Sequence, residues 1–356
     1  MSFNLSNEFF FLFFLFSIIF SYSIVRISKK IFKGQLLDKD FLKPQAFHKK
    51  AVARAGGLIF FFLYLIFIFL YFKIYSYFLM DYFILGFSLF VIGFLDDLKV
   101  KINPNYRLLL MLIILAFSIN ILSVEINRSG LTLLNSWLDN NIFQLCFVLL
   151  CLLFIINGSN LIDGYNGLLI IHFLIITSVY YLINISNQNI SFSNILFIQM
   201  IIAIVILFFN FPKAKIFLGD SGSYLLGVLI SINSIKTVEM NINIEPFFFA
   251  AILFYLFFEV FFSFVRKCLN RKSPLKPDDM HFHMIIFRIL KKKYNLKKSN
   301  YLTSIIINLI YLTLISPLYY LKDSVFCRYY FILLILLYLL SYFKLLSIRL
   351  KKYENI

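Results

Sequence analysis

The chain has 356 residues, of which 61% are hydrophobic and only 14% charged, and its mean hydropathy is +0.88. A water-soluble domain does not need so apolar a composition, which is typical of a protein that crosses a membrane several times. The formal net charge is +17, and in a membrane protein Lys and Arg first report the side on which the loops lie. The composition therefore excludes a soluble globular domain, and we expect the lipid bilayer as a partner and no nucleic acid.

Long apolar runs predict an all-α bundle of about eleven transmembrane helices, because a helix needs roughly 20 apolar residues to cross about 30 Å of hydrocarbon. The first run is long and no small-residue cleavage site follows it, so we interpret it as an anchor. No repeat or Pro/Gly/Ser-rich linker divides the chain, and 1–356 is expected to be one integral-membrane domain. The runs are 8–26, 57–73, 78–95, 107–124, 142–156, 168–184, 194–211, 222–236, 247–265, 302–320 and 328–346.

The distribution of basic residues predicts the orientation of these helices. With the N-terminus on the outer side, all but five of the 34 Lys and Arg residues fall in inner segments. Because Lys and Arg collect on the cytoplasmic side, we expect the N-terminus outside and the C-terminus inside. The expected cytoplasmic loops are 27–56, 96–106, 157–167, 210–221 and 266–301, and the outer basic residues are Lys73, Arg128, Lys236, Lys322 and Arg328.

The most polar interruption between two apolar runs is the segment 157–168, which reads N-G-S-N-L-I-D-G-Y-N-G-L. Asn157 and Asn160 would share one face of a last helical turn, and Asp163 follows three residues later. Glycines beside them allow the backbone to approach a ligand closely. The segment is either a binding loop for a phosphate–metal complex or polar head group, or a solvated turn.

Two further acidic positions lie at helix ends on the same side. Asp96 and Asp97 close an apolar run, and adjacent helical residues diverge by about 100°, so one could ligate a metal while the other takes a proton or orients a partner. The alternative is a helix-end acid pair balanced by Lys99 and Lys101. Asp220 stands where another helix is expected to begin, a position that suits phosphate binding or an N-terminal cap.

Amides, cations and imidazoles add to this face. Asn210 and Lys213 precede Asp220 in one loop. His281 and His283 follow a basic segment, and we expect them to contact a phosphate or sugar, since zinc would need further ligands. His172, inside an apolar run, is expected to be a packing residue.

Glu259 is the one acid deep in an expected span. It lies two helical turns before Arg266, so the pattern indicates an internal ion pair between them.

Carboxylate and amide oxygens select Mg²⁺, with Mn²⁺ as the alternative, and Mg²⁺ commonly bridges substrate phosphates. A cation site of this kind at the cytoplasmic surface suggests phosphoryl-type transfer between a soluble nucleotide and a lipid.

Five segments in order resemble the cytoplasmic motifs of the polyprenyl-phosphate N-acetylhexosamine-1-phosphate transferase family, glycosyltransferase family 4. This family includes bacterial enzymes that start O-antigen and enterobacterial common antigen, and also the phospho-MurNAc-pentapeptide translocase. The resemblance extends from about His48 to Phe287. The segments are H-K-K-A-V-A-R-A-G-G, F-L-D-D, N-G-S-N-L-I-D-G-Y-N-G-L, N-F-P-K-A-K-I-F-L-G-D-S-G-S and H-F-H.

The resemblance implies ten or eleven helices in the bacterial inner membrane, with the N-terminus periplasmic and the active site cytoplasmic. It implies a Mg²⁺-dependent reaction of a UDP-N-acetylhexosamine with undecaprenyl phosphate, giving undecaprenyl-diphospho-sugar and UMP. The implied catalytic residues are Asp96, Asp97, Asp163 and Asp220, and the implied metal ligands are Asp220, Asp97 and Asn160. The implied substrate-binding residues are Lys49, Lys50, Arg54, Asn157, Asn160, Asn210, Lys213, His281 and His283.

Three positions depart from the family pattern. Asn166 replaces a second acid, Ala53 replaces a proline, and Met284 stands where a third adjacent histidine is found in the peptidoglycan enzyme. We therefore favour an initiating transferase for O-antigen or another surface polysaccharide over the phospho-MurNAc-pentapeptide translocase. A homodimer is a further possibility, and the pattern does not name the sugar.

A secondary transporter is the competing interpretation from another class, and a structural scaffold is a third. A transporter would place acids near the bilayer midplane and show two related halves.

Overall fold

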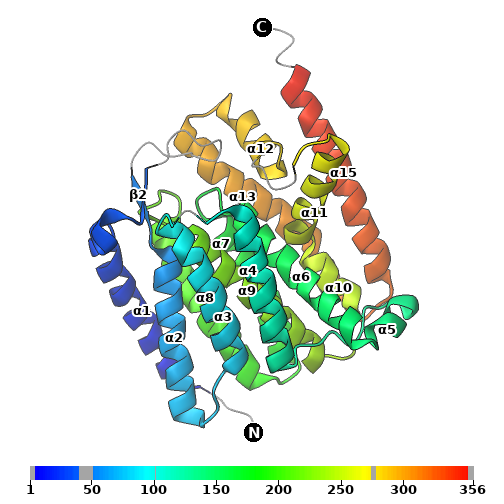
Figure 1. The fold of residues 1–356 in the computed structure, drawn as a ribbon, viewed down its shortest axis with the longest axis horizontal. Coiled ribbons are helices and arrows are strands. Elements are labelled where there is room, and N and C mark those ends of the chain that lie inside the picture. The colour runs from blue at the N-terminus through cyan, green and yellow to red at the C-terminus, as the bar shows by residue number, and fades with distance from the viewer. Residues whose placement is uncertain (1–4, 40–50, 101, 274–277, 352–356) are drawn as a thin grey trace.

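A computed structural model describes residues 5–39, 51–100, 102–273 and 278–351, and it confirms the all-α polytopic fold (Figure 1). The long helices run side by side, and α15 ends at the same end of the bundle where β2 and α12 lie. The helices are α1 (Asn7–Ile27), α2 (Gly56–Tyr75), α3 (Met80–Asp97), α4 (Pro104–Leu122), α5 (Thr132–Leu138), α6 (Asn141–Ile162), α7 (Leu168–Ser186), α8 (Ile190–Asn210), α9 (Gly219–Met240), α10 (Pro246–Ile252), α11 (Phe254–Leu269), α12 (Phe282–Lys291), α13 (Leu296–Ile315), α14 (Leu318–Leu321) and α15 (Phe326–Lys351), with a 3-10 turn at Ile31–Gly34.

Each of the eleven expected spans coincides with a long helix or with the α10–α11 pair. Within the described residues, eight helices are long and apolar enough to cross a membrane, or nine when the bent α10–α11 pair counts as one span. Helices α3 and α9 are not among them, since both carry several polar or charged residues. The number eleven and the orientation of the termini stay predictions.

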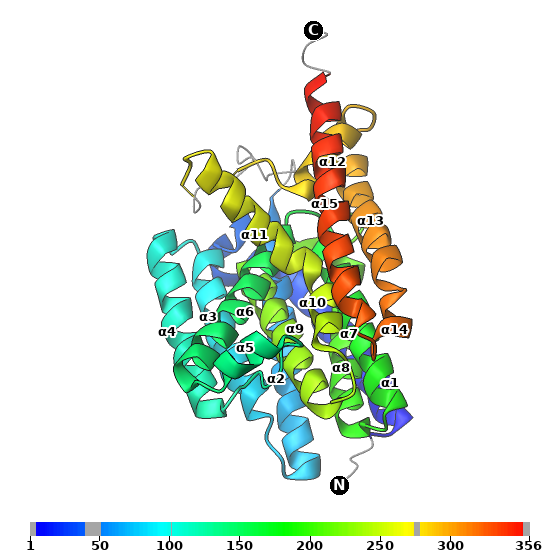
Figure 2. The ribbon, with the colours of Figure 1, turned by 90° about the vertical axis from the view of Figure 1, so that its right-hand side faces the viewer.

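The expected span 247–265 is bent. It consists of α10 and α11, which meet at an angle of 70°, and α11 slants across the upper end of the bundle (Figure 2). The sequence has neither Pro nor Gly at the break. The two halves pack on different partners, α10 on α15 and α11 on α6, so tertiary contacts support the bend.

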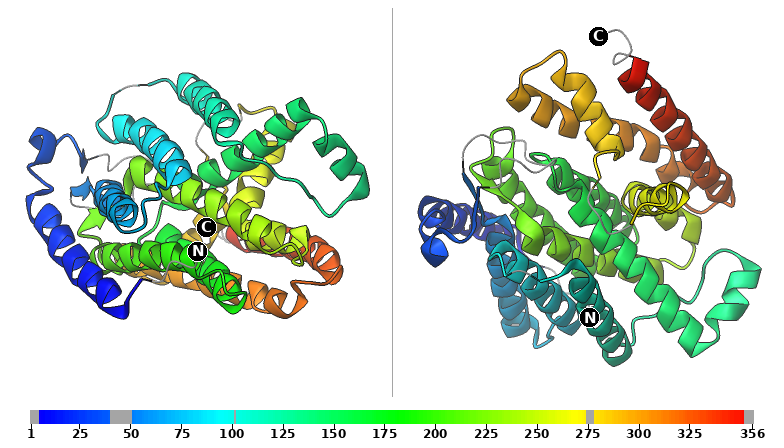
Figure 3. Two further views of the ribbon diagram at one scale, coloured as in Figure 1. Left: turned by 90° about the horizontal axis from the view of Figure 1, so that it is seen from below. Right: turned by 45° about the horizontal axis from the view of Figure 1, so that its top comes forward.

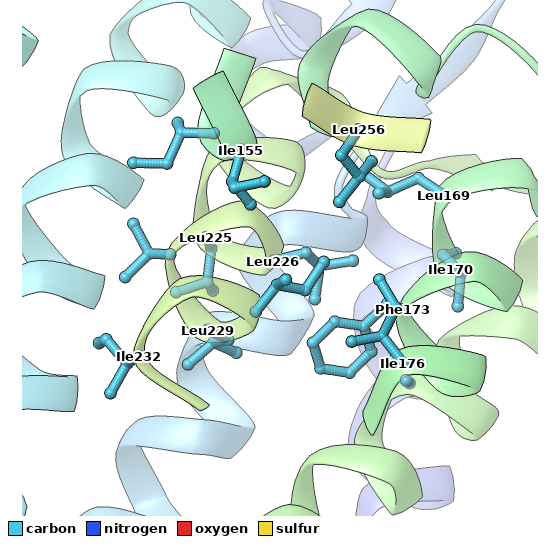
Figure 4. Close-up of a cluster of buried hydrophobic side chains, with 14 of the residues drawn as sticks. Ile155, Leu169, Ile170, Phe173, Ile176, Leu225, Leu226, Leu229, Ile232 and Leu256 are labelled. Carbon is cyan, nitrogen blue, oxygen red and sulfur yellow. The ribbon is translucent and has the colours of Figure 1, made fainter. Parts of the chain in front are cut away.

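Helix α9 is the centre of the bundle and packs against α2, α3, α6 and α7. Its apolar side chains meet those of α6, α7 and α11 in the interior (Figure 4), where Leu226 and Leu229 are fully buried. Helices α1 and α15 lie at opposite edges (Figure 3). Because α9 begins with the Asp220 segment, the most buried helix presents that segment to one end of the bundle.

Glycine allows α3 and α9 to approach closely beside that segment. A Cβ on Gly93 of α3 would lie 2.5 Å from both the carbonyl carbon of Asp220 and the backbone nitrogen of Ser221. No real Cβ contact is that short, so any larger residue at 93 must push the two helices apart. The close approach brings the end of α3 to the start of α9.

A small three-stranded sheet joins two of the loops and was not part of the all-α prediction. Strand β2 (Val52–Arg54) pairs antiparallel with β1 (Leu37–Asp38) and parallel with β3 (Ile216–Phe217). In this register Arg54 lies opposite Phe217. Strands of two or three residues are too short to show a period-two pattern, which is why the sequence did not indicate them.

We expect Gly93→Ala to lower the midpoint of thermal unfolding in detergent, because the added methyl group overpacks the α3–α9 contact at a cost of about 1–3 kcal/mol. The matched control is Gly86→Ala in the same helix, where the added Cβ meets Leu225 Cδ1 at an ordinary 3.4 Å. Equal midpoints for the two variants would contradict the close-approach argument.

Candidate active site

A cavity of about 1570 Å³ lies between the loops at one end of the bundle. Each of the five segments expected to form the active face contributes to its wall, through Arg54, Asp96, Asp163, Asp220 and His281. The motifs that are scattered along the sequence therefore form one site. Lys49 and Lys50 lie outside the described residues.

Asp97 does not face the cavity as a free ligand, because its carboxylate caps the start of α9. It is 1% exposed, its Oδ1 accepts from the Asp220 backbone N–H at 3.0 Å, and its Oδ2 accepts from the Ser221 N–H at 2.9 Å and Oγ at 2.6 Å. Gly219 has φ of +79°, and a Cβ there would lie 2.6 Å from Oδ2 of Asp97. The L-G-D-S sequence thus suits this contact, and Asp97 satisfies backbone groups that a helix start leaves unpaired.

Asp96 and Asp220 come together on the cavity wall with Arg107 between them. Burial of the site and the neighbouring carboxyl group of Asp96 both raise the pKa of Asp220. Nη1 of Arg107 pairs with Oδ2 of Asp96 and lies 3.5 Å from Oδ2 of Asp220. A guanidinium group between two carboxylates offsets their mutual repulsion.

Arg107 was not among the expected site residues. Arg107 lies in the first turns of α4, close to Asn103, which caps this helix. A cation near a helix N-terminus is unfavourable by itself. An arginine at this position could therefore have indicated, from the sequence, that acidic partners come from elsewhere in the fold.

Arg54 connects the β-sheet to the same carboxylates. Its Nη2 and Nε contact Oδ2 of Asp38 at 2.9 and 3.2 Å, and its Nη1 lies 3.4 Å from Oδ1 of Asp97 and 3.8 Å from Oδ1 of Asp220. Asp38 also lines the cavity and was missed, since a single acid in a loop has no distinctive pattern.

The end of α6 provides the amides that were expected to share a face. The helix continues to Ile162, so Asn157 and Asn160 lie on its last turns and both line the cavity. Asn157 donates to the Leu153 carbonyl at 2.8 Å. This contact holds its amide group at the cavity wall.

Asp163 follows at the end of α6 and lines the cavity. No described residue donates a hydrogen bond to its carboxylate. Desolvation at this position, with the nearby carboxylates of Asp220 and Asp97, raises the pKa of Asp163 well above its usual range. The protonated carboxyl group that this favours can both donate a hydrogen bond to a ligand and accept one.

Asn210 and Asn166 hold loops together around the cavity that they line. The Oδ1 of Asn210 accepts from the Gly167 N–H at 2.6 Å, and its Nδ2 donates to the Ile216 carbonyl at 2.9 Å. The Nδ2 of Asn166 donates to the Pro212 carbonyl at 2.9 Å, which a carboxylate could not do. The departure at Asn166 thus fits a structural contact, while Lys213 is exposed on the cavity rim.

The two histidines have different surroundings. Their rings are stacked, with centroids 5.5 Å apart and planes 3° from parallel. His281 lines the cavity, whereas His283 is 1% exposed, lies 3.4 Å from the Tyr255 hydroxyl and is not among the residues that line it. The expectation that His283 contacts substrate is therefore wrong for this structure, whereas the contact of His281 with substrate stays a prediction.

The expected pair of Glu259 with Arg266 is also wrong. Glu259 contacts Nδ1 of His281 at 3.2 Å, whereas Arg266 pairs with Asp278 at 2.7 Å. The bend before α11 and the fold of the following loop create these partners, which helical spacing could not indicate. His172 is confirmed as a packing residue: it is fully buried and its Nδ1 lies 3.3 Å from Asn308.

The donor groups at the site fit Mg²⁺ in their chemistry. Within the part of the chain that the structure describes, no group of three or more His, Cys, Asp and Glu side chains forms a ready-made metal cage. Mg²⁺ is usually held by one or two carboxylates together with substrate phosphates and water. Asp96 and Asp220 provide such a pair of carboxylates.

Burial of His283 leads to a prediction for stability. Burial lowers the pKa of its imidazole to about 4, while an unfolded His has a pKa near 6.5. Because the unfolded state binds the proton first, His283 destabilises the fold as the pH falls from about 6.5 to about 4. The unfolding midpoints of the wild type and His283→Asn should therefore converge as the pH is lowered through this range, and a constant difference would contradict the assignment.

The sequence of this chain is similar to those of two groups of enzymes. The family model described as glycosyl transferase family 4 matches residues 79–238. An undecaprenyl-phosphate alpha-N-acetylglucosaminyl 1-phosphate transferase of Thermotoga maritima is 26% identical over 260 residues, covering 73% of this chain and 76% of the relative. A probable undecaprenyl-phosphate N-acetylglucosaminyl 1-phosphate transferase of Bacillus subtilis is 27% identical over 238 residues, 66% of each chain.

The second group consists of phospho-N-acetylmuramoyl-pentapeptide-transferases. The protein of that name from Borrelia hermsii is 26% identical over 250 residues, covering 62% of this chain and 71% of the relative. The residues matched by the family model run from the start of α3 into α9 and include Asp96, Asp97, Asp163 and Asp220. The chain is therefore similar to glycosyl transferase family 4 over residues 79–238, and relatives of both groups align with three fifths or more of its length.

Proposed function

We propose that the protein transfers the N-acetylhexosamine 1-phosphate of a UDP-sugar to undecaprenyl phosphate, with release of UMP. The observation that carries this proposal is a single cavity with a charged end and an apolar wall. The charged end contains Asp96, Asp220, Arg54 and Arg107. The names of the T. maritima and B. subtilis relatives support the lipid phosphate and the N-acetylglucosamine 1-phosphate.

The apolar wall suits a polyprenyl chain. It is formed by α4, α6 and α11, of which α6 packs against both others. Burial of hydrocarbon there would contribute about 25 cal/mol for each Å² removed from water. The lipid phosphate would then enter the charged end from the membrane side. The apolar residues are Leu108, Met111, Leu150, Leu153, Phe154, Val260 and Phe264.

The cationic residues would bind the diphosphate. Arginine has a planar fork of N–H donors that matches phosphate oxygens, so Arg54 and Arg107 can exchange their carboxylate partners for phosphate. Lys213 and His281 line the same cavity and would add further contacts. Asn157 and Asp163 would exchange hydrogen bonds with the uridine or the sugar. Asn210 would hold their loop in place.

Asp96 and Asp220 would hold Mg²⁺, or Mn²⁺, with Asn160 nearby. Asp96 takes the place of Asp97 among the expected metal ligands, because both Asp97 oxygens accept hydrogen bonds from α9. When bound, the cation would neutralise charge on the diphosphate. The residues around it would orient the two phosphates and exclude water.

In the reaction, an oxygen of the lipid phosphate forms a bond to the sugar-bearing β-phosphorus. The bond between that phosphorus and the bridging oxygen breaks, and UMP leaves with the electron pair. A phosphate monoester is largely a dianion at pH 7, since its second pKa is about 6, so no general base is required. Asp96 would orient the attacking phosphate through its ion pair with Arg107.

The charge distribution supports a cytoplasmic active face. By its resemblance to the initiating transferases, we assign the protein to the bacterial inner membrane, at the start of O-antigen or another surface polysaccharide. The phospho-MurNAc-pentapeptide reaction is the second candidate, because relatives of that name also match. Met284 in place of a third adjacent histidine favours a simple hexosamine.

The direct test uses purified protein in detergent with undecaprenyl phosphate and Mg²⁺. UDP-GlcNAc, UDP-GalNAc, their 6-deoxy forms and UDP-MurNAc-pentapeptide are offered separately, and UMP release is followed with and without chelator. UMP from one hexosamine, lost on chelation, is expected. UMP from the pentapeptide alone would favour the second candidate, and folded protein that is silent with all donors would favour a transporter.

We expect Asp220→Asn and Asp96→Asn to reduce kcat by about 10²-fold or more, since each removes a charge that acts on the transferring phosphates. Asp81→Asn is the matched control, because Asp81 lies in the first turn of α3, at the opposite end of that helix from Asp96, and pairs with Lys236 at 2.6 Å. Turnover at the wild-type rate in Asp220→Asn would remove this residue from the proposed site.

Arg107→Ala should lower kcat/KM by about 10²-fold or more, because the diphosphate loses a cation fixed by Asp96 and Asp220. Arg107→Lys should recover part of that loss, since lysine supplies the charge without the fork. Lys236→Ala, which removes a paired cation remote from the cavity, controls for general effects of charge. Full activity in Arg107→Ala would refute the assignment.

A further inference from the structure

Glu259 is a carboxylate in the interior of α11, and groups from two other segments converge on it. Its Oε1 lies 3.2 Å from Nδ1 of His281 and accepts from the Phe282 backbone N–H at 2.9 Å. Its Oε2 accepts from the Tyr338 hydroxyl of α15 at 2.9 Å. The residue is only 2% exposed.

A carboxylate at such a place is costly for the fold. Within a membrane bundle an acid is unfavourable by about 2.5–3.5 kcal/mol or more, and apolar side chains of similar volume often pack at least as well. The surroundings of Glu259 are otherwise aromatic, with Phe254, Phe258 and Phe262 on the same helix. The groups that it binds therefore indicate its task.

The contact with Glu259 fixes the orientation of the His281 ring. Nδ1 donates to the carboxylate, so the opposite nitrogen, Nε2, is directed to the other side of the ring. There it lies 3.8 Å from Oδ1 of Asp278, and both His281 and Asp278 line the cavity. One ring nitrogen is thus held by the protein interior and the other is left at the cavity wall.

We propose that Glu259 is a positioning residue, which accepts a hydrogen bond from Nδ1 of the His281 imidazolium so that the Nε2–H group faces a phosphate group in the cavity, and that Tyr338 holds Glu259 in turn. This inference rests on the proposed function, in which the cavity binds a diphosphate. It makes the C-terminal helix α15, which lies outside the residues matched by the family model, a support of the active site.

A second set of contacts from α15 fixes the segment before His281. The Tyr342 hydroxyl donates to the Met280 carbonyl at 2.9 Å and accepts from Nη1 of Arg266 at 3.0 Å. Nη2 of Arg266 contacts Asp278 at 2.7 Å. The backbone on which His281 lies is therefore held on one side by α11 and on the other by α15.

The test is a double-mutant cycle that measures kcat and KM for the UDP-sugar. Glu259→Gln keeps the shape and removes the charge, and we expect kcat/KM to fall by about 10–100-fold, as for carboxylate partners of functional histidines. Tyr338→Phe removes one hydroxyl and should cost about 2–10-fold. In a His281→Ala background both changes should cost less than about twofold, because their effect passes through His281.

Glu245→Gln is the matched control, since Glu245 pairs with Arg328 at 2.7 Å and is not among the residues that line the cavity. It should keep the wild-type kcat/KM. If Glu259→Gln does not fold, as judged from its unfolding midpoint, the test uses Tyr338→Phe alone, with kcat/KM compared in the wild-type and His281→Ala backgrounds. Two results would overturn the positioning role alone. One is an unchanged kcat/KM in the folded variants, and the other is a fall in kcat/KM that is as large in the His281→Ala background as in the wild type. Wild-type protein that neither turns over nor binds any UDP-sugar would overturn the proposed function together with this inference.

Discussion

The contact between the Asp97 carboxylate and the first turn of α9 is the interaction on which the site depends. A helix start has unpaired N–H groups and a partial positive charge, and a buried carboxylate needs such donors. Asp97 satisfies both requirements at once, with two backbone N–H groups and one hydroxyl. Because the approach requires glycine at 93 and 219, the end of α3 and the start of α9 form one rigid unit.

That unit determines where the remaining charges lie. With Asp97 committed to α9, its neighbour Asp96 points elsewhere, as adjacent residues on a helix must, and meets Asp220 and Arg107 at the cavity. The β-sheet brings Arg54 to the carboxylates of Asp97 and Asp220. Two guanidinium groups beside a cluster of acids create a site that can exchange its internal ion pairs for phosphate oxygens and a cation.

The support around the site extends beyond the charged cluster. The buried Glu259 orients His281 from within α11, and tyrosines of α15 contact both Glu259 and the preceding loop. An aromatic hydroxyl is well suited to this place, since its ring packs in the apolar bundle while its oxygen provides one hydrogen bond. The last helix, which looks from its sequence like one more membrane span, thus contributes polar contacts to the functional end of the molecule.

The sequence by itself determined that this protein is a helical membrane protein with acidic and amide motifs gathered on one face. Hydropathy and charge are properties of consecutive residues, and the bilayer imposes a length on each apolar run, so both can be read without a structure. The sequence also indicated Asp96, Asp163, Asp220 and His281 for the site. Only the tertiary structure decided which side chains meet. It placed Asp96 and His281 at the cavity but their neighbours Asp97 and His283 away from it, and it brought Arg107 and Tyr338 to the site or its support. The partners of a buried charge are chosen by contacts between distant segments, such as the bend between α10 and α11, and neither helical spacing nor composition specifies them.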